Sequence, residues 1–438
     1  MTVAFTGAKL IDGNGAAPVE NATIIVDGTK IVEISDKRKF DSGVQVFDVA
    51  GKTLMPGLID THLHISAFFQ WLISVQHRSL GYLFVLAIRH MRQLIESGVT
   101  SARDMGGLEA GICEAQAEGL IVGPRMQTAI VIIQPTNCLT DLRSGLNRTI
   151  TPQGRYEILP GLPEPWADGP DAVRAKVREA LRLGADSIKL ANNATPWGNP
   201  KVRPDRPLFT RAELEAAVDE AHRAGVPVTC HVVGWDSTES TLDAIRAGVD
   251  LIDHGNLLDD ECIEEMVKRG TWYCPMFSVL DYHRSRNPNQ SVRAFAERTY
   301  QQTAASFQKA VKAGVRICMG TDQGYETGVQ GFEMRNMVAN GYTPMQTIVA
   351  STKLAAEAMR VDRLVGTLEV GKEADLLVLE GDPSQDIGIF SDPIHLRLVM
   401  QAGKPLAGPM AREFPYQPAE NLDFMSAMLT GQLKKRSW

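Results

Sequence analysis

The sequence lacks the patterns that mark a secreted, membrane-spanning or nucleic-acid-binding chain. No segment offers 18 uninterrupted apolar residues, and the first residues show no charged leader followed by an apolar core. The formal net charge of -7 is modest, and no basic block occurs beyond the short run Lys434 to Arg436, which we interpret as a solvated chain end. The six cysteines show no CxxC spacing. We therefore expect a cytoplasmic protein with reduced thiols and with neither a membrane nor a nucleic acid as partner.

A repeated order of elements fills the middle of the chain. With 438 residues, 44% of them hydrophobic, the chain can bury one large domain and a smaller one. From about residue 88 onward, helix-like stretches end at a glycine and are followed by a short apolar run. The glycines are Gly98, Gly184, Gly225, Gly248, Gly270 and Gly314.

Eight apolar runs are candidate parallel strands joined by crossover helices. They are Leu58 to His64, Thr100 to Met105, Arg125 to Ile133, Asp186 to Ala191, Val226 to Val233, Leu251 to His254, Trp272 to Phe277 and Val315 to Thr321. Eight such units over about 300 residues predict an α/β fold of the (β/α)8 TIM-barrel type, with an open doubly wound sheet as the alternative. We assign this barrel to residues 56–359.

The two ends of the chain have a different texture. Residues 1–55 alternate short strand-like runs with Asp-Gly and Gly-Lys turns, and similar runs return within residues 360–410. Because chain termini often lie close together, we expect both ends to form one small β-sandwich domain. Residues 411–438 are weakly patterned and are predicted to be a C-terminal arm or tail.

Histidines and an aspartate end several of the predicted strands. His62 and His64 are two residues apart on a strand and therefore point to the same side. His231 and His254 end two further strands, and Asp322 follows the last one. Barrel enzymes carry their chemistry at such strand ends, and imidazoles with a carboxylate suit zinc and similar divalent ions. The alternatives are satisfied polar core histidines and, for the aspartate, a helix cap.

Lys189 is the least expected residue of this group. Its neighbours Ser187, Ile188 and Leu190 place it at the end of an apolar strand, where burying an unpaired ammonium is costly. The position therefore requires an ionic partner or a modification.

These residues lie in motifs that resemble the amidohydrolase superfamily over most of the chain. The motifs are Met55 to His64, Gly98 to Gly107, Asp186 to Lys189, Thr229 to His231, Ile252 to Gly255, Met319 to Asp322 and Val365 to Leu379. The resemblance implies two divalent metal ions, with zinc expected and manganese, cobalt and nickel left open. It also implies a carbamylated Lys189 that bridges the ions. By the same carry-over His62, His64 and Asp322 hold one ion, His231 and His254 hold the other, and Asp322 shuttles the proton while a hydroxide between the ions attacks a carbonyl.

Within the superfamily the chain is most similar to the branch of prolidase-like dipeptidases, carboxypeptidases and ochratoxin-type amide hydrolases. We therefore expect cleavage of an amide-type C–N bond in a dipeptide, N-acyl amino acid or related amide. Two loops depart from that branch, because residues 133–138 lack its Gly-Gly-His segment and residues 192–198 lack its paired glycines. Small-molecule contacts are expected from Trp71, Trp197, Tyr273 and His283, and a homo-oligomer is expected.

Other activities stay open on the sequence. A carbamate, urea, ester or lactone, or a phosphotriester, could be attacked by the same hydroxide. A deaminase is less favoured, because the stretch after His231 reads Val232, Val233 and Gly234 and lacks the usual glutamate. A catalytically silent binding protein is least favoured, because such relatives typically lose metal ligands and this chain keeps them.

Overall fold

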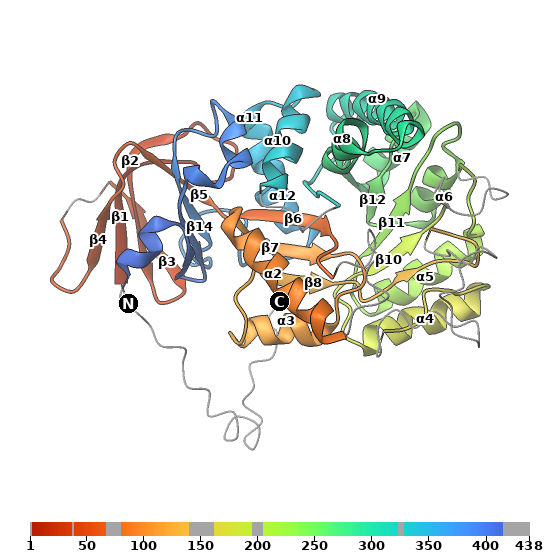
Figure 1. Ribbon diagram of the computed structural model, residues 1–438, viewed down its shortest axis with the longest axis horizontal. Coiled ribbons are helices and arrows are strands. Elements are labelled where there is room, and N and C mark those ends of the chain that lie inside the picture. Colours follow the sequence, from red (N-terminus) through yellow and green to blue (C-terminus); the bar gives the residue numbers. More distant parts are fainter. Residues whose placement is uncertain are drawn as a thin grey trace, which may run out of the picture.

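The structure is a computed structural model that describes residues 2–36, 39–66, 80–139, 162–194, 205–322 and 328–414. Helices and strands alternate through the middle of this part, and strands dominate its two ends (Figure 1). The protein therefore has the α/β fold that the sequence predicts.

Both ends of the described chain meet in one sheet of eight strands (Figure 1). The order is β16-β15-β14-β5-β1-β2-β3, and β4 pairs with β1. The strands are β1 (Thr2–Leu10), β2 (Val19–Asp27), β3 (Lys30–Ser35), β4 (Gln45–Asp48), β5 (Lys52–Pro56), β14 (Leu376–Glu380), β15 (Leu396–Gln401) and β16 (Lys404–Ala407). The antiparallel pairing of β5 with β14 joins the two ends of the chain, and Phe5, Ile24 and Leu376 pack in their shared apolar core. A two-layered sandwich is not shown by this single sheet, so the sandwich and the domain boundaries stay predictions.

Two all-parallel sheets occupy the middle of the chain. Their orders are β6-β7-β8 and β13-β12-β11-β10-β9. The strands are β6 (Leu58–Leu63), β7 (Val99–Asp104), β8 (Arg125–Thr128), β9 (Ile132–Ile133), β10 (Ile188–Ala191), β11 (Val228–Val232), β12 (Leu251–His254) and β13 (Trp272–Cys274). The predicted strand from residue 125 to 133 is broken in two, because Ile130 takes a left-handed φ of 64° that a continuous strand does not allow.

The predicted eighth strand lies between the two parallel sheets without forming a regular strand itself. Ile317 makes an isolated parallel bridge with Tyr273 of β13, and the Thr61 N–H of β6 donates to the Met319 carbonyl at 3.0 Å. The segment that carries Asp322 is thereby held beside β6. These hydrogen bonds do not form one continuous eight-stranded sheet, so the closed barrel stays a prediction.

Eleven α-helices lie in the described part of the chain, and six of them end one or two residues before a glycine that the sequence singles out. They are α2 (Leu80–Glu96), α3 (Ala110–Ala117), α4 (Pro170–Arg182), α5 (Arg211–Arg223), α6 (Glu239–Ala247), α7 (Asp260–Arg269), α8 (Phe277–Arg286), α9 (Gln290–Ala313), α10 (Val329–Ala339), α11 (Pro344–Ala350) and α12 (Lys353–Ala358). All six glycines singled out in the sequence have positive φ. Gly248 caps α6 at a φ of 96°, a left-handed conformation that glycine adopts without a Cβ clash.

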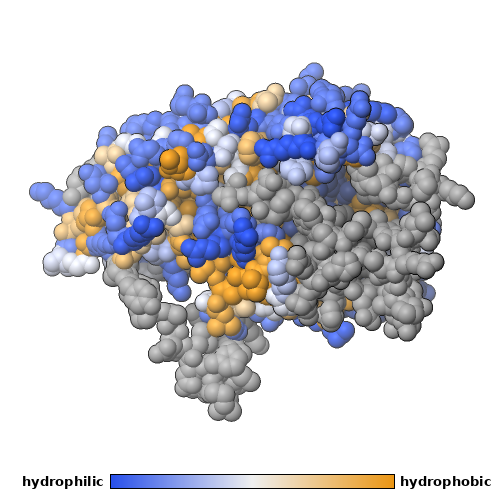
Figure 2. All heavy atoms as spheres, viewed as in Figure 1, coloured by the Kyte–Doolittle hydropathy of each residue, from blue (hydrophilic) through white to orange (hydrophobic). Residues whose placement is uncertain are grey.

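Several further expectations concern the surface and the cysteines. None of the described helices is both long enough and apolar enough to cross a bilayer. All six cysteines are buried free thiols, and in such positions a thiol packs as a small apolar side chain. Figure 2 shows apolar side chains around α2, where Tyr82 and Val85 are 47% and 66% exposed. The expected homo-oligomer is not tested by one chain and stays a prediction.

Candidate metal centre

His62 of β6, His64 directly after this strand, and the aspartate that follows the eighth segment form the centre. His62 and His64 are buried, and their Nε2 atoms lie 3.4 and 3.3 Å from Oδ1 of Asp322. One ligand atom from each of the three residues lies within 4.8 Å of the others. The two histidines reach the same point because residues two apart along extended backbone point to the same side, and the chain directly after β6 continues in that direction.

The Nδ1 atoms of His62 and His64 form hydrogen bonds with other parts of the protein. Nδ1 of His62 lies 2.8 Å from Oδ1 of Asp253, and Nδ1 of His64 lies 3.2 Å from the Gly106 carbonyl oxygen. Because both acceptors need a proton from the ring, we assign the proton to Nδ1 in each case. In this tautomer the Nε2 lone pairs face Asp322 and are free to bind a metal ion.

His231 from β11 and His254 from β12 extend the cluster. Their ring centroids are 4.4 Å apart, and the His254 ring lies 5.7 Å from that of His62. Burial lowers the pKa of His254 to about 4 and lowers that of His231 well below its ordinary value. Both rings are therefore neutral at pH 7, as ligands must be. Nε2 of His231 is buried and has no hydrogen-bond partner in the described part of the chain.

Asp322 is held in a strained turn beside β6. Its φ is 55°, and that of His254 is 68°, a left-handed conformation that is uncommon for residues other than glycine. The Asp322 N–H donates to the His62 carbonyl at 2.8 Å. Burial favours a raised pKa for Asp322, but the neighbouring imidazoles of His62, His64 and His254 outweigh it and hold the pKa well below its usual range. The carboxylate is thus ionised and, at 20% exposure of its side chain, can still be reached from solvent.

Asp60 stabilises this turn through hydrogen bonds from neighbouring residues. The Thr321 hydroxyl donates to Asp60 Oδ2 at 2.8 Å, and the Gln330 amide donates to the same oxygen at 3.0 Å. Burial raises the pKa of Asp60 to about 6. This fully buried carboxyl was not singled out from the sequence, although it precedes His62 by two residues and so faces the same interior.

Lys189 of β10 has an ionic partner that sequence reasoning missed. Its buried ammonium pairs with Asp253, which also accepts the hydrogen bond from His62. Burial favours a raised pKa for Asp253, but the hydrogen bond from His62 and the charge of Lys189 outweigh it and lower the pKa. The buried charge of Lys189 therefore does not by itself demand a modification. The signal that could have found Asp253 is its place beside His254 at the end of a fully buried strand.

The predicted substrate contacts fall into three groups. Trp71 and Trp197 lie outside the described residues. Tyr273 is fully buried in β13, where its hydroxyl donates to the Gly255 carbonyl at 3.2 Å, so we no longer treat it as a substrate contact. His283 lies half-buried on α8, and the Asn287 amide is 3.1 Å from its Nδ1. Burial lowers the pKa of His283, and the charge of Asp322 opposes that shift, which places the imidazole within electrostatic reach of the centre.

Comparisons with known proteins agree on one family. A family model described as "Amidohydrolase family" matches residues 53–406. The ochratoxinase of Aspergillus niger is 28% identical over 434 residues, which covers 93% of this chain and 87% of that protein.

Solved structures give the same result. The crystal structure of the Aspergillus niger ochratoxinase matches with a TM-score of 0.81 at 26% identity, covering 93% of this chain and 96% of that one. A prolidase complexed with N-methylphosphonate-L-proline matches with a TM-score of 0.83 at 26% identity, covering 92% and 99%. A Xaa-Pro dipeptidase with bound methionine matches with a TM-score of 0.79 at 28% identity, also covering 92% and 99%.

Proposed function

The chain belongs to the amidohydrolase family and is a hydrolase of that superfamily, and from this premise we propose that it cleaves an amide-type C–N bond with the help of two divalent metal ions. The observation that carries the proposal is the convergence of His62, His64 and Asp322, with His231 and His254 beside them. The substrate we propose is a dipeptide, an N-acyl amino acid or a related amide. The names of the similar prolidase and Xaa-Pro dipeptidase support the dipeptide class.

The donor set fits the ions that the family implies. His62, His64 and Asp322 would hold one ion, and His231 and His254 the other, with zinc as the expected metal. Two observations support the fit: the Nδ1 contacts of His62 and His64 direct Nε2 inward, and Nε2 of His231 is buried without a hydrogen-bond partner in the described residues. The chemistry that bound ions supply is a water acidified towards neutral pH and a polarised substrate carbonyl. A carbamylated Lys189 bridging the ions remains part of the proposal and rests on the family resemblance.

Asp322 is the residue to which we assign the proton transfers. Because its pKa is held low, it is ionised at neutral pH and can accept the proton of the attacking water. It then gives the proton to the leaving nitrogen, since an amine leaves far more easily than an amide anion. The strained turn, fastened to Asp60 through Thr321, keeps the carboxylate at one position while the proton moves. His283 is proposed to contact the substrate from α8.

The fold that we propose around this centre is a closed (β/α)8 barrel over residues 56–359. Parallel pairing within β6-β7-β8 and within β13-β12-β11-β10-β9 supports it. So do the parallel bridge between Ile317 and Tyr273 of β13 and the hydrogen bond that the Thr61 N–H of β6 donates to the Met319 carbonyl. A barrel would explain why residues from five distant segments converge at one end.

An Asp322→Asn variant tests the assigned role. Wild type is first screened on dipeptides, N-acyl amino acids, carbamates, ureas and lactones, and the metal content of both proteins is measured. We expect turnover of amides and a loss of kcat of about 10²- to 10⁴-fold in the variant, because a positioned proton-transfer group contributes about that much. Asp281→Asn on α8 is the matched control and should keep its rate. A variant that retains both metal and rate on a hydrolysed amide would contradict the proposal.

The carbamate needs a separate measurement. Protein loaded with metal in ¹³C-labelled bicarbonate should show a carbamate carbon signal that is lost in Lys189→Ala. A wild-type spectrum without that signal would remove the bridging carbamate while leaving the hydrolase assignment intact.

A further inference from the structure

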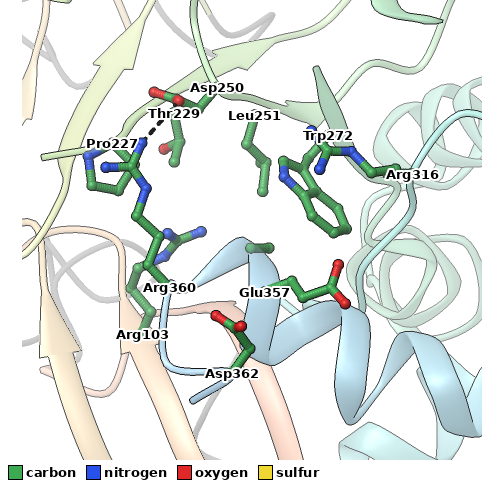
Figure 3. A pocket seen from close by; sticks show the side chains of 11 residues that line it. Arg103, Pro227, Thr229, Asp250, Leu251, Trp272, Arg316, Glu357, Arg360 and Asp362 are labelled. Atoms are coloured by element: carbon green, nitrogen blue, oxygen red, sulfur yellow. Dashed lines mark hydrogen bonds and ion pairs between the residues drawn. The ribbon is translucent and has the colours of Figure 1, made fainter. Parts of the chain in front are cut away.

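A cavity of about 440 Å³ lies at the opposite end of the strands from the histidines. Figure 3 shows the side chains that line it. Pro227, Asp250 and Trp272 line it where β11, β12 and β13 begin, whereas His231 and His254 lie where β11 and β12 end. The cavity is therefore separate from the candidate metal centre. Its volume falls in the range of roughly 300 to 1,000 Å³ that is typical of ligand sites.

The inner end of the cavity contains polar atoms that the described protein leaves unsatisfied. Arg103 reaches it from β7 and is fully buried, with Nε donating to the Thr61 carbonyl at 3.0 Å. Its Nη1 and Nη2 have no hydrogen-bond partner in the described residues, and neither has the fully buried hydroxyl of Thr229. Burying a guanidinium without an anion beside it is costly, so this end of the cavity favours a negatively charged occupant.

No described acidic side chain takes that place. Asp253 acts on the charge of Arg103 through space, but its two carboxylate oxygens are engaged by His62 and Lys189. Asp250 lines the cavity, yet it is paired with Arg360 at 3.2 Å (Figure 3) and with His222 at 2.8 Å. A small anion from solution would therefore be the missing partner of Arg103.

The walls and mouth limit what kind of anion fits. The Arg316 guanidinium lies 4.3 Å from the Trp272 ring centroid, which gives the wall one cationic and one apolar surface. Glu357 and Asp362 add negative charge at the outer part of the lining. These carboxylates would repel a dianion more strongly than a monoanion.

We propose that the cavity binds a small monocarboxylate, held by Nη1 and Nη2 of Arg103 and by the hydroxyl of Thr229. The two terminal nitrogens of a guanidinium match the two oxygens of a planar carboxylate in a bidentate arrangement. The hydroxyl of Thr229 supplies a third donor. This binding site is independent of the hydrolytic centre and of the activity proposed for it.

Acetate is the probe, titrated into the metal-loaded protein by calorimetry at an ionic strength held constant with sodium chloride. We expect one saturable site whose affinity falls about tenfold in Thr229→Val, because a hydrogen bond to a charged ligand is lost while side-chain volume is kept. Thr100→Val is the matched control: Thr100 lies on β7 with a buried hydroxyl that also lacks a described partner, but it does not line the cavity. Its affinity for acetate should equal that of wild type. Arg103→Met should abolish binding.

Three results would overturn the proposal. The first is the absence of saturable acetate binding in wild type. The second is an acetate affinity that is equal in Thr229→Val and Thr100→Val, because acetate would then bind elsewhere, for example at the metal ions. The comparison of these two variants remains decisive even if Arg103→Met does not fold. The third is phosphate binding as tightly as acetate at the same ionic strength. The proposal expects acetate, a planar monoanion, to bind at least about tenfold more tightly than phosphate.

Discussion

Replacing Asp253 with asparagine tests whether Lys189 carries a positive charge in the folded, metal-free protein. Asp253 is fully buried, pairs with the Lys189 ammonium and accepts a hydrogen bond from His62 Nδ1 at 2.8 Å. The amide oxygen of asparagine can still accept from His62, so the main loss is the negative charge opposite the ammonium. Removing one partner of a buried ion pair typically lowers the free energy of unfolding by about 3–5 kcal/mol, because the other charge stays buried. We expect a loss of that size in Asp253→Asn.

The assay is urea unfolding of wild type and variant, both metal-free and in buffer depleted of carbon dioxide. Asp219→Asn is the control, because Asp219 forms ion pairs with Arg174 and Arg223 at the surface and should change stability little. The folded-state pKa of Asp253 is lowered, so its contribution is present above the unfolded pKa of about 4 and is lost as the pH falls towards the folded value. The difference between wild type and variant should therefore shrink below about pH 4.

A loss of under about 1 kcal/mol at pH 7 would refute this reasoning, since most substitutions without a buried-charge effect lie near that value. It would mean that Lys189 is neutral or does not contact Asp253. Repeating the measurement with metal and bicarbonate extends the test. If Lys189 becomes a carbamate, the ammonium disappears and the loss caused by Asp253→Asn should become smaller.

Two further changes probe the surroundings of the centre. Gly320→Ala should reduce kcat and destabilise the fold by about 1–3 kcal/mol, because its Cβ would lie 2.6 Å from Cys274 Sγ and 2.8 Å from His62 Cβ and so displace the turn of Asp322; steady-state kinetics with unchanged activity would contradict it. Burial raises the folded pKa of Glu333 to about 7, so the native state favours its protonated form and its contribution to stability declines as the pH rises from about 4.5 to 7. Relative to Glu333→Gln, wild type should lose up to about 3 kcal/mol over that window; unfolding free energies that stay parallel with pH in the two proteins would show that Glu333 does not titrate there.

Local patterns predicted much of the element order. The helix-ending glycines were correct, because a left-handed residue after a helix is a short-range requirement that glycine meets at its own position. The breaks within predicted strands were not foreseen. Ile130 and Met276 take left-handed φ values of 64° and 53°, although apolar side chains normally favour extended backbone. Only packing against distant segments can impose such conformations, so no local signal announces them.

For the candidate site, too, some features could be predicted from the sequence and others appear only in the structure. The order of amino acids alone identified which residues could bind metal, because strand alternation and the end of each apolar run are readable from short stretches such as His62 to His64. The structure alone supplied their partners: Asp253 between Lys189 and His62, Asp60 beneath Asp322, and the cavity in which Arg103 is buried. These contacts join residues up to 261 positions apart. Their strength comes from burial and from charges on other segments, which exist only after the chain has folded.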